Sequence, residues 1–179
     1  MPEHKLRATL RALNEGGVEF ILVGGLAAVL QGAPVHTFDV DVVYSQETAN
    51  MTRLLAVLES IEAVFRIQPE RGLQPTASHL DGSGHLNLIT SHGPLDLLAT
   101  IGRDLRYQDL LSDSVELEIG DGVRIRVLKL ERLISLKQDL AGEKDRAVLP
   151  VLRRTLEEAR LRDSKARKGQ SRPDLKVFP

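Results

Sequence analysis

The chain has 179 residues, of which 42% are hydrophobic and 27% charged, values that are ordinary for one soluble globular domain. The formal net charge is -1, so bulk charge alone does not hold the protein on nucleic acid or on a membrane. The balance hides an asymmetry, because residues 1–100 carry 6 basic and 11 acidic residues whereas residues 101–179 carry 18 and 14. The absence of cysteine excludes disulfides and thiolate chemistry and favours a reducing, cytoplasmic location.

The first part of the chain predicts alternating helices and strands, because apolar residues recur at helical spacing or in short buried runs. In chain order we expect a helix over residues 4–13, a strand over 18–23, a short helix over 26–30, a strand over 39–44 and a helix from 46 to about 62. The longest nearly apolar run, residues 20–30, is well short of the roughly 20 residues that span a bilayer, so no membrane segment is expected. Residues 68–84 are rich in Pro, Gly, Ser and His, which predicts a mobile loop.

The second half predicts more strands and then a pair of helices. We expect strands over residues 85–90 and 95–101, a hairpin of strands 115–119 and 123–127, and helices over 130–140 and 144–159. Pro150 should kink the last helix or mark its true start. These elements predict an α+β domain over residues 1–159, with a mixed sheet within 18–127, flanking helices and a C-terminal helical pair. Residues 160–179 are basic and poor in apolar residues, which predicts a flexible or partner-docked tail.

Two aspartates on one predicted strand are the first candidate for chemistry. Side chains alternate along a strand, so Asp39 and Asp41 point to one face while Val40 and Val42 point to the core. Carboxylates held this close repel one another unless a cation lies between them, and Mg²⁺ prefers such oxygen ligands. The pattern is also that of a strand with a solvated outer face, so both interpretations stay open at this point.

Two further features sit near this pair in the predicted fold. Gly24-Gly25 joins a buried strand to a helix, and such a turn either binds a phosphate on backbone N–H groups or makes only a tight connection. Asp96 interrupts an apolar strand, and a neighbouring strand would bring it beside Asp39 and Asp41. Alone, Asp96 is equally a strand-end residue. Together, three carboxylates around two metal ions are suited to phosphoryl or nucleotidyl transfer.

The combination of Gly24-Gly25, then Thr37-Phe38-Asp39-Val40-Asp41, then Asp96 resembles the signature of the nucleotidyltransferase superfamily related to DNA polymerase beta, in its minimal bacterial branch. The resemblance covers about residues 6–159. It implies that Asp39, Asp41 and Asp96 bind two Mg²⁺ ions and are catalytic. It also implies that Gly24, Gly25 and Thr37 contact the nucleotide, and that Asp96 completes the acceptor-side metal site and accepts the acceptor's proton.

The C-terminal helices extend this resemblance to toxin–antitoxin-associated members of the superfamily. Basic residues there commonly face the nucleotide phosphates, which makes Lys137 and Lys144 candidate triphosphate contacts; each is equally typical of a solvated helix face. Two positions depart from the pattern: Val35 and Glu143 stand where relatives often carry arginine. The departures remove two potential phosphate ligands but leave the carboxylates intact.

We therefore expect an Mg²⁺-dependent nucleotidyltransferase that moves a nucleoside monophosphate from an NTP such as ATP to an acceptor hydroxyl, amine or phosphate. The acceptor class is open and includes protein, a small molecule and RNA such as tRNA, which the basic tail would attract. The alternative is a catalytically degenerate protein of the same fold, acting as an antitoxin-like or regulatory binding module with a protein partner.

Overall fold

The computed structural model of the chain describes residues 2–140 and 142–170, except for the side chains of residues 2–4, 140, 143–145 and 166–170. The strands are β1 (Phe20–Val23), β2 (Val40–Tyr44), β3 (Val64–Phe65), β4 (His85–Thr90), β5 (Gly93–Leu98), β6 (Ser114–Glu118) and β7 (Arg124–Leu128). The helices are α1 (Pro2–Glu15), α2 (Gly24–Leu30), α3 (Thr48–Ser60), the 3-10 helix η1 (Pro69–Arg71), α4 (Ala77–Leu80), α5 (Tyr107–Leu110), α6 (Leu130–Leu140) and α7 (Glu143–Gln170).

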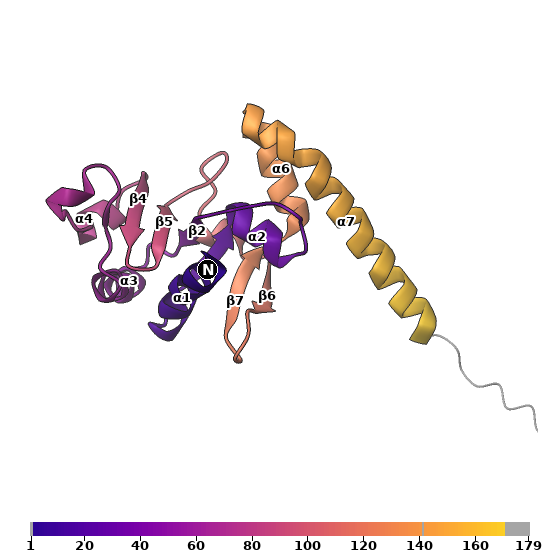
Figure 1. Ribbon diagram of the computed structural model, residues 1–179, viewed down its shortest axis with the longest axis horizontal. Coiled ribbons are helices and arrows are strands. Elements are labelled where there is room, and N and C mark those ends of the chain that lie inside the picture. The colour runs from indigo at the N-terminus through magenta and orange to yellow at the C-terminus, as the bar shows by residue number, and fades with distance from the viewer. Residues whose placement is uncertain (1, 141, 171–179) are drawn as a thin grey trace, which may run out of the picture.

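The strands form one seven-stranded mixed sheet in the order β3-β4-β5-β2-β1-β7-β6. Helix α1 packs across β2, β5 and β7 and against α3, while α2 contacts β1, β2 and α6. Helices α6 and α7 lie together at one end, and α7 extends away from the sheet (Figure 1). The predicted class is confirmed: a mixed sheet flanked by helices and followed by a C-terminal helical pair.

The central strand β2 has two different neighbours. It pairs antiparallel with β1 and parallel with β5. Its residues Val40, Val42 and Val43 are fully buried, so the strand is fixed by apolar contacts on both faces. Because side chains alternate, Asp41 points to the face opposite Val40 and Val42, as the sequence predicts. Any one-residue slip of β2 would bury this carboxylate in the core, so the apolar pattern specifies the register.

Residues 68–84 do not form the uninterrupted loop predicted from their composition. They contain η1 and α4, and the two-residue strand β3 precedes them. Helix α4 is held by the fully buried Leu80 and by the hydrogen bond in which the backbone N–H of Thr76 donates to His79 Nδ1 at 3.0 Å. Elements of two to four residues are too short to show periodicity, so sequence patterns do not detect them.

Helix α7 runs to Gln170, eleven residues beyond the predicted end at Ala159. It contains Pro150, which therefore does not mark its start. The prediction relied on apolar periodicity, which fades after residue 159, whereas the residues that follow are mainly Arg, Lys, Leu and Ala, which favour helix by intrinsic propensity. Of the predicted basic tail, residues 160–170 continue this helix, and residues 171–179 lie outside the described residues.

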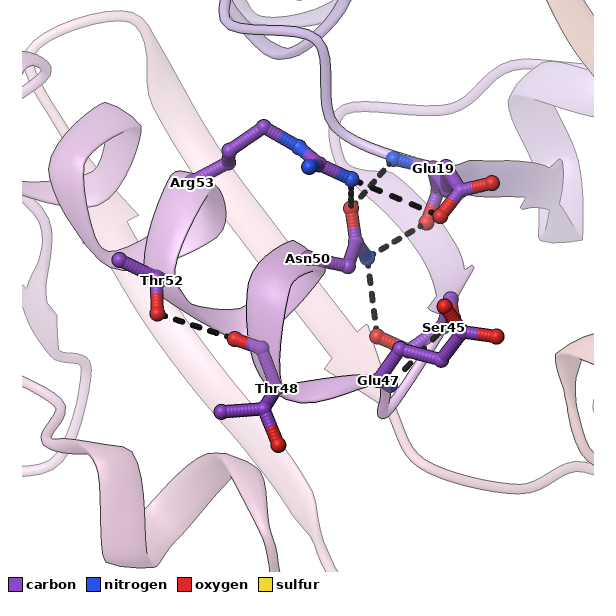
Figure 2. A network of polar contacts seen from close by, with 7 residues as sticks. All are labelled: Glu19, Ser45, Glu47, Thr48, Asn50, Thr52 and Arg53. Carbon is purple, nitrogen blue, oxygen red and sulfur yellow. Dashed lines mark hydrogen bonds and ion pairs between the residues drawn. The ribbon is translucent and has the colours of Figure 1, made fainter.

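A fully buried asparagine joins α3 to the β1–β2 pair (Figure 2). The Asn50 side chain accepts a hydrogen bond from the backbone N–H of Glu19 at 2.7 Å and donates to the carbonyls of Glu19 and Ser45 at 3.0 and 2.8 Å. Arg53 donates to the same side-chain oxygen at 3.2 Å and forms an ion pair with Glu19. Since Glu19 precedes β1 and Ser45 follows β2, this network anchors the end of the pair opposite the candidate site.

We expect Asn50→Ala to lower the free energy of unfolding by about 3 kcal/mol, because the N–H of Glu19 and the carbonyl of Ser45 lose their hydrogen bond to a buried side chain, while the carbonyl of Glu19 keeps only the bond from the Ser45 N–H. Thr52→Ala, on the exposed side of the same helix, is the matched control and should cost about 0.5 kcal/mol or less. Urea unfolding followed by circular dichroism measures both. Equal losses in the two variants would contradict the anchoring role.

Candidate functional site

The three predicted aspartates meet at one place on the sheet. The parallel pairing of β2 and β5 sets Asp41 opposite Asp96, and Asp39 lies two residues before Asp41 on the approach to β2. Each of the three residues offers one carboxylate oxygen, and these oxygens lie within 4.8 Å of one another. All three side chains are half-buried. The structure therefore brings together the carboxylates that the sequence assigned to one face.

The glycine pair is shaped by two of its neighbours. Gly24 has φ +66°, a left-handed conformation, and a Cβ built on it would overlap the Asp41 carboxylate. A Cβ on Gly25 would lie 2.8 Å from Thr37 Oγ1. Helix α2 begins at Gly24 itself, two residues earlier than predicted. The absence of both side chains therefore makes room for Asp41 and Thr37 beside the strand-to-helix turn.

Thr37 orients the first carboxylate. Its hydroxyl Oγ1 donates a hydrogen bond to Asp39 Oδ1 at 2.7 Å. The same oxygen lies against Gly25, so the threonine bridges the glycine turn and the aspartates. The superfamily resemblance implies that Thr37 contacts the nucleotide, which stays a prediction, and in the structure its hydroxyl binds Asp39.

One charged residue of the site was missed at the sequence level. Arg66, directly after β3, forms an ion pair with Asp96 through its terminal nitrogen and Oδ1. The two residues are 30 positions apart, and only the strand order β3-β4-β5 brings them together. No local pattern around Arg66 could have indicated this contact, because it depends on the short strand β3.

Burial and mutual repulsion act on the protonation of the carboxylates. The pKa of Asp41 is raised to about 7. Burial is the largest cause, the charges of Asp39 and Asp96 act in the same direction, and those of Lys137 and Arg66 act against it. Burial also raises the pKa of Asp96, with the Arg66 guanidinium acting in the other direction. A cation placed between these oxygens would remove the repulsion.

A cavity of about 240 Å³ opens beside Asp41. Its polar wall includes Gly24, Asp41 and Lys137, and its apolar wall comes from β1, β5 and α6 through Val23, Leu98, Leu133 and Leu136, among others. Lys137 thus lines the cavity from α6, and its contact with the triphosphate stays a prediction. Lys144 belongs to α7, but its side chain lies outside the described residues, as does that of Glu143. Val35, one of the two departures from the expected motif, packs partly buried against the core.

Within the described part of the chain, the three aspartates are the one group of three or more His, Cys, Asp or Glu residues placed to hold a metal ion. No helix there combines the length and the apolar character that a membrane crossing requires.

The family model described as "Nucleotidyl transferase of unknown function (DUF2204)" matches residues 3–172. The chain belongs to this family. Among solved structures, it is similar to a putative nucleotidyltransferase from Thermotoga maritima, with a TM-score of 0.53 and 21% identity, covering 86% of this chain and 91% of that one. It is also similar to the antibiotic-resistance factor ANT(2'')-Ia, with a TM-score of 0.54 and 15% identity, covering 94% of each chain.

Because both sequence identities are low, these two similarities show only that this chain shares the fold of the two structures. A search of curated proteins found no match. The family assignment agrees with the superfamily expected from the glycine and aspartate motifs, and the three carboxylates are the feature of this member that could bind a divalent metal.

Gly24→Ala tests the close approach of Asp41 to the turn. Gly32→Ala is the matched control, because Gly32 also has a positive φ, of 93°, but has no atom within 4 Å of an added Cβ. Both variants carry the left-handed backbone cost of about 1 kcal/mol. Gly24→Ala should lose about 2 kcal/mol more in urea unfolding, because the methyl group must displace Asp41. Equal losses would show that the contact does not constrain the turn.

Asp41→Asn tests the electrostatic cost of the site. The raised pKa of Asp41 means that the folded protein binds more protons than the unfolded chain between about pH 4 and 7, so wild-type stability falls as the pH rises through this window. Without metal, the uncharged Asn variant should therefore be more stable than wild type at pH 8, by about 2 kcal/mol, and nearly equal at pH 4. Urea unfolding in EDTA at both pH values measures this difference. A variant less stable than wild type at pH 8 would contradict it.

Proposed function

We propose that the protein is an Mg²⁺-dependent nucleotidyltransferase that moves a nucleoside monophosphate from an NTP to an acceptor. The observation that carries this proposal is the meeting of Asp39, Asp41 and Asp96, each with an oxygen within 4.8 Å of the others. The family assignment supports the same reaction class. A solvated strand face, the competing interpretation of the sequence motif, does not account for three half-buried carboxylates from two strands that repel one another.

The donor set fits divalent metal. All three ligands are carboxylate oxygens, which Mg²⁺ prefers, and the charges of Lys137 and Arg66 offset their repulsion only in part. In the proposed site Asp39 and Asp41 hold two ions jointly and Asp96 completes the acceptor side. When bound, such ions activate an acceptor oxygen and stabilise the charge of the leaving diphosphate.

The remaining residues indicate which side of the site would bind the triphosphate and which the acceptor. Gly24 and Lys137 line the cavity beside Asp41, Gly25 follows Gly24 in the same turn, and we assign the triphosphate to this side. Lys144 is assigned to the phosphates by the superfamily resemblance alone. Asp96 then faces the acceptor. By the superfamily resemblance we assign it to take the proton of the attacking group.

The transfer balances with these roles. The acceptor oxygen forms a bond to the α-phosphorus while the bond from that phosphorus to the bridging oxygen breaks. Pyrophosphate leaves with the bonding electron pair, and the acceptor proton passes to Asp96. The protein's contribution is to position the groups and to match the developing charge.

The acceptor remains open among RNA such as tRNA, protein and small molecules. Exposed basic residues on the projecting helix α7, among them Arg153, Arg162 and Lys165, would attract a polyanionic acceptor. A toxin–antitoxin partner and a cytoplasmic location stay predictions from the sequence.

Binding and transfer are tested separately. Calorimetry with Mg²⁺ and each NTP should show binding by wild type, and incubation with each labelled NTP and total cellular RNA or protein should label one acceptor class. Asp39→Asn and Asp41→Asn should reduce labelling by about a thousandfold, because the metal ligands supply several kcal/mol of transition-state stabilisation. Asp163→Asn, on α7, is the matched control for NTP binding and should leave that binding unchanged.

Two outcomes would overturn the proposal. Absence of NTP binding in the presence of Mg²⁺ would remove the substrate. NTP binding without transfer to any acceptor, together with partner-protein binding that is retained after Asp39→Asn and Asp41→Asn, would instead establish the non-catalytic binding module.

A further inference from the structure

Arg66 is anchored by β4 and is not among the residues that line the cavity beside Asp41. Its backbone N–H donates to the carbonyl of Asn87 at 2.9 Å, which continues the β3–β4 ladder by one residue. Its side chain donates to the carbonyl of Leu88 at 3.4 Å and forms the ion pair with Asp96. The guanidinium is therefore held by β4 while it contacts a residue of β5.

The sheet register explains why this contact forms. Asp41 pairs with Asp96, and Asp96 pairs with Asn87 on β4, so the three residues make one row across the sheet. Residues paired across neighbouring strands project to the same face. Arg66 follows in this row through its bond to Asn87, and its side chain reaches back over β4 to Asp96.

The geometry of the ion pair leaves one oxygen of the carboxylate available. The guanidinium contacts Oδ1 of Asp96, and a carboxylate has two oxygens. The side chain of Asp96 is only 15% exposed, whereas that of Arg66 is 39% exposed. The carboxylate thus sits toward the interior of the site, with the arginine on its outer side.

We propose that Arg66 is a positioning residue for the metal site, holding Asp96 by one oxygen so that the other faces Asp39 and Asp41. This inference rests on the proposed function, because it takes the three carboxylates to bind a divalent cation. Ligating carboxylates are commonly oriented by a second hydrogen bond, and loss of such a partner costs about 10–100-fold in metal affinity. Arg66 supplies this bond to the one ligand that comes from β5.

Two physical roles of Arg66 predict changes of opposite sign. If the guanidinium acted only as a nearby positive charge, or competed with metal for Asp96, its removal would strengthen the binding of a cation. If it orients the carboxylate, its removal weakens binding. Metal affinity without nucleotide therefore separates the two roles, and it does so without measuring catalysis.

The experiment is titration calorimetry of the full-length protein with Mn²⁺ and no nucleotide. Arg66→Gln should bind Mn²⁺ about tenfold more weakly than wild type. Arg66→Lys should recover part of the loss, because lysine keeps the charge but not the planar fork. Arg71→Gln is the matched control: Arg71 lies on η1, five residues along, and hydrogen-bonds Gln68 at 3.0 Å. It should match wild type.

A double-mutant cycle identifies the route of the effect. In the Asp96→Asn background, Arg66→Gln should have no further effect on Mn²⁺ affinity, because the carboxylate that it orients is gone. Thermal unfolding in EDTA checks that each variant is folded. Unchanged or stronger Mn²⁺ binding by folded Arg66→Gln, or a loss that persists fully in the Asp96→Asn background, would overturn the positioning role. Failure of wild type itself to bind Mn²⁺, both alone and together with an NTP, would instead overturn the proposed function.

Discussion

Negative charge is concentrated at one place on the sheet, where Asp39, Asp41 and Asp96 hold carboxylate oxygens within 4.8 Å of one another. Left alone, this arrangement opposes folding, because burial and like charge both disfavour ionised carboxylates. The apolar rows of the same strands offset the cost. Val40 and Leu95 are opposite one another in the β2–β5 pair and are fully buried. The register that buries them also forces Asp41 and Asp96 together, so the core and the site are specified by one pairing.

The surroundings of the carboxylates are arranged from several elements at once. Thr37 donates a hydrogen bond to Asp39, and Gly24 leaves space for Asp41. Lys137 approaches from α6, and Arg66 from the end of β3. The chain segments that supply these groups are far apart in sequence, and Asn50 fixes the opposite end of the β1–β2 pair to α3. The carboxylates that destabilise the fold therefore lie at one end of the β1–β2 pair, and the hydrogen bonds of Asn50 stabilise its other end.

Much of the site could be predicted because it follows from local rules. The two-residue period of a strand places Asp39 and Asp41 on one face, and an acidic residue within the apolar run of β5 marks Asp96. Arg66 could not be predicted, since its position depends on a two-residue strand and on the order of β3, β4 and β5. The steric role of Gly24 was equally hidden, because it depends on a side chain 17 positions away in the sequence. The positions of Arg66 and Gly24 relative to the aspartates depend on packing between residues far apart in the sequence, which local periodicity does not predict.

The two cations that flank the aspartates have a consequence for how a loaded site would form. Taken formally, three carboxylates, one lysine and one arginine sum to a charge of -1. An NTP with four negative charges accompanied by two Mg²⁺ ions is neutral as a unit, so the complete substrate would enter without changing that sum. Binding of the metal alone or of the NTP alone would change the net charge of the site. Electroneutrality thus favours joint arrival of nucleotide and metal, and it makes their combined binding far less dependent on ionic strength than the binding of either component.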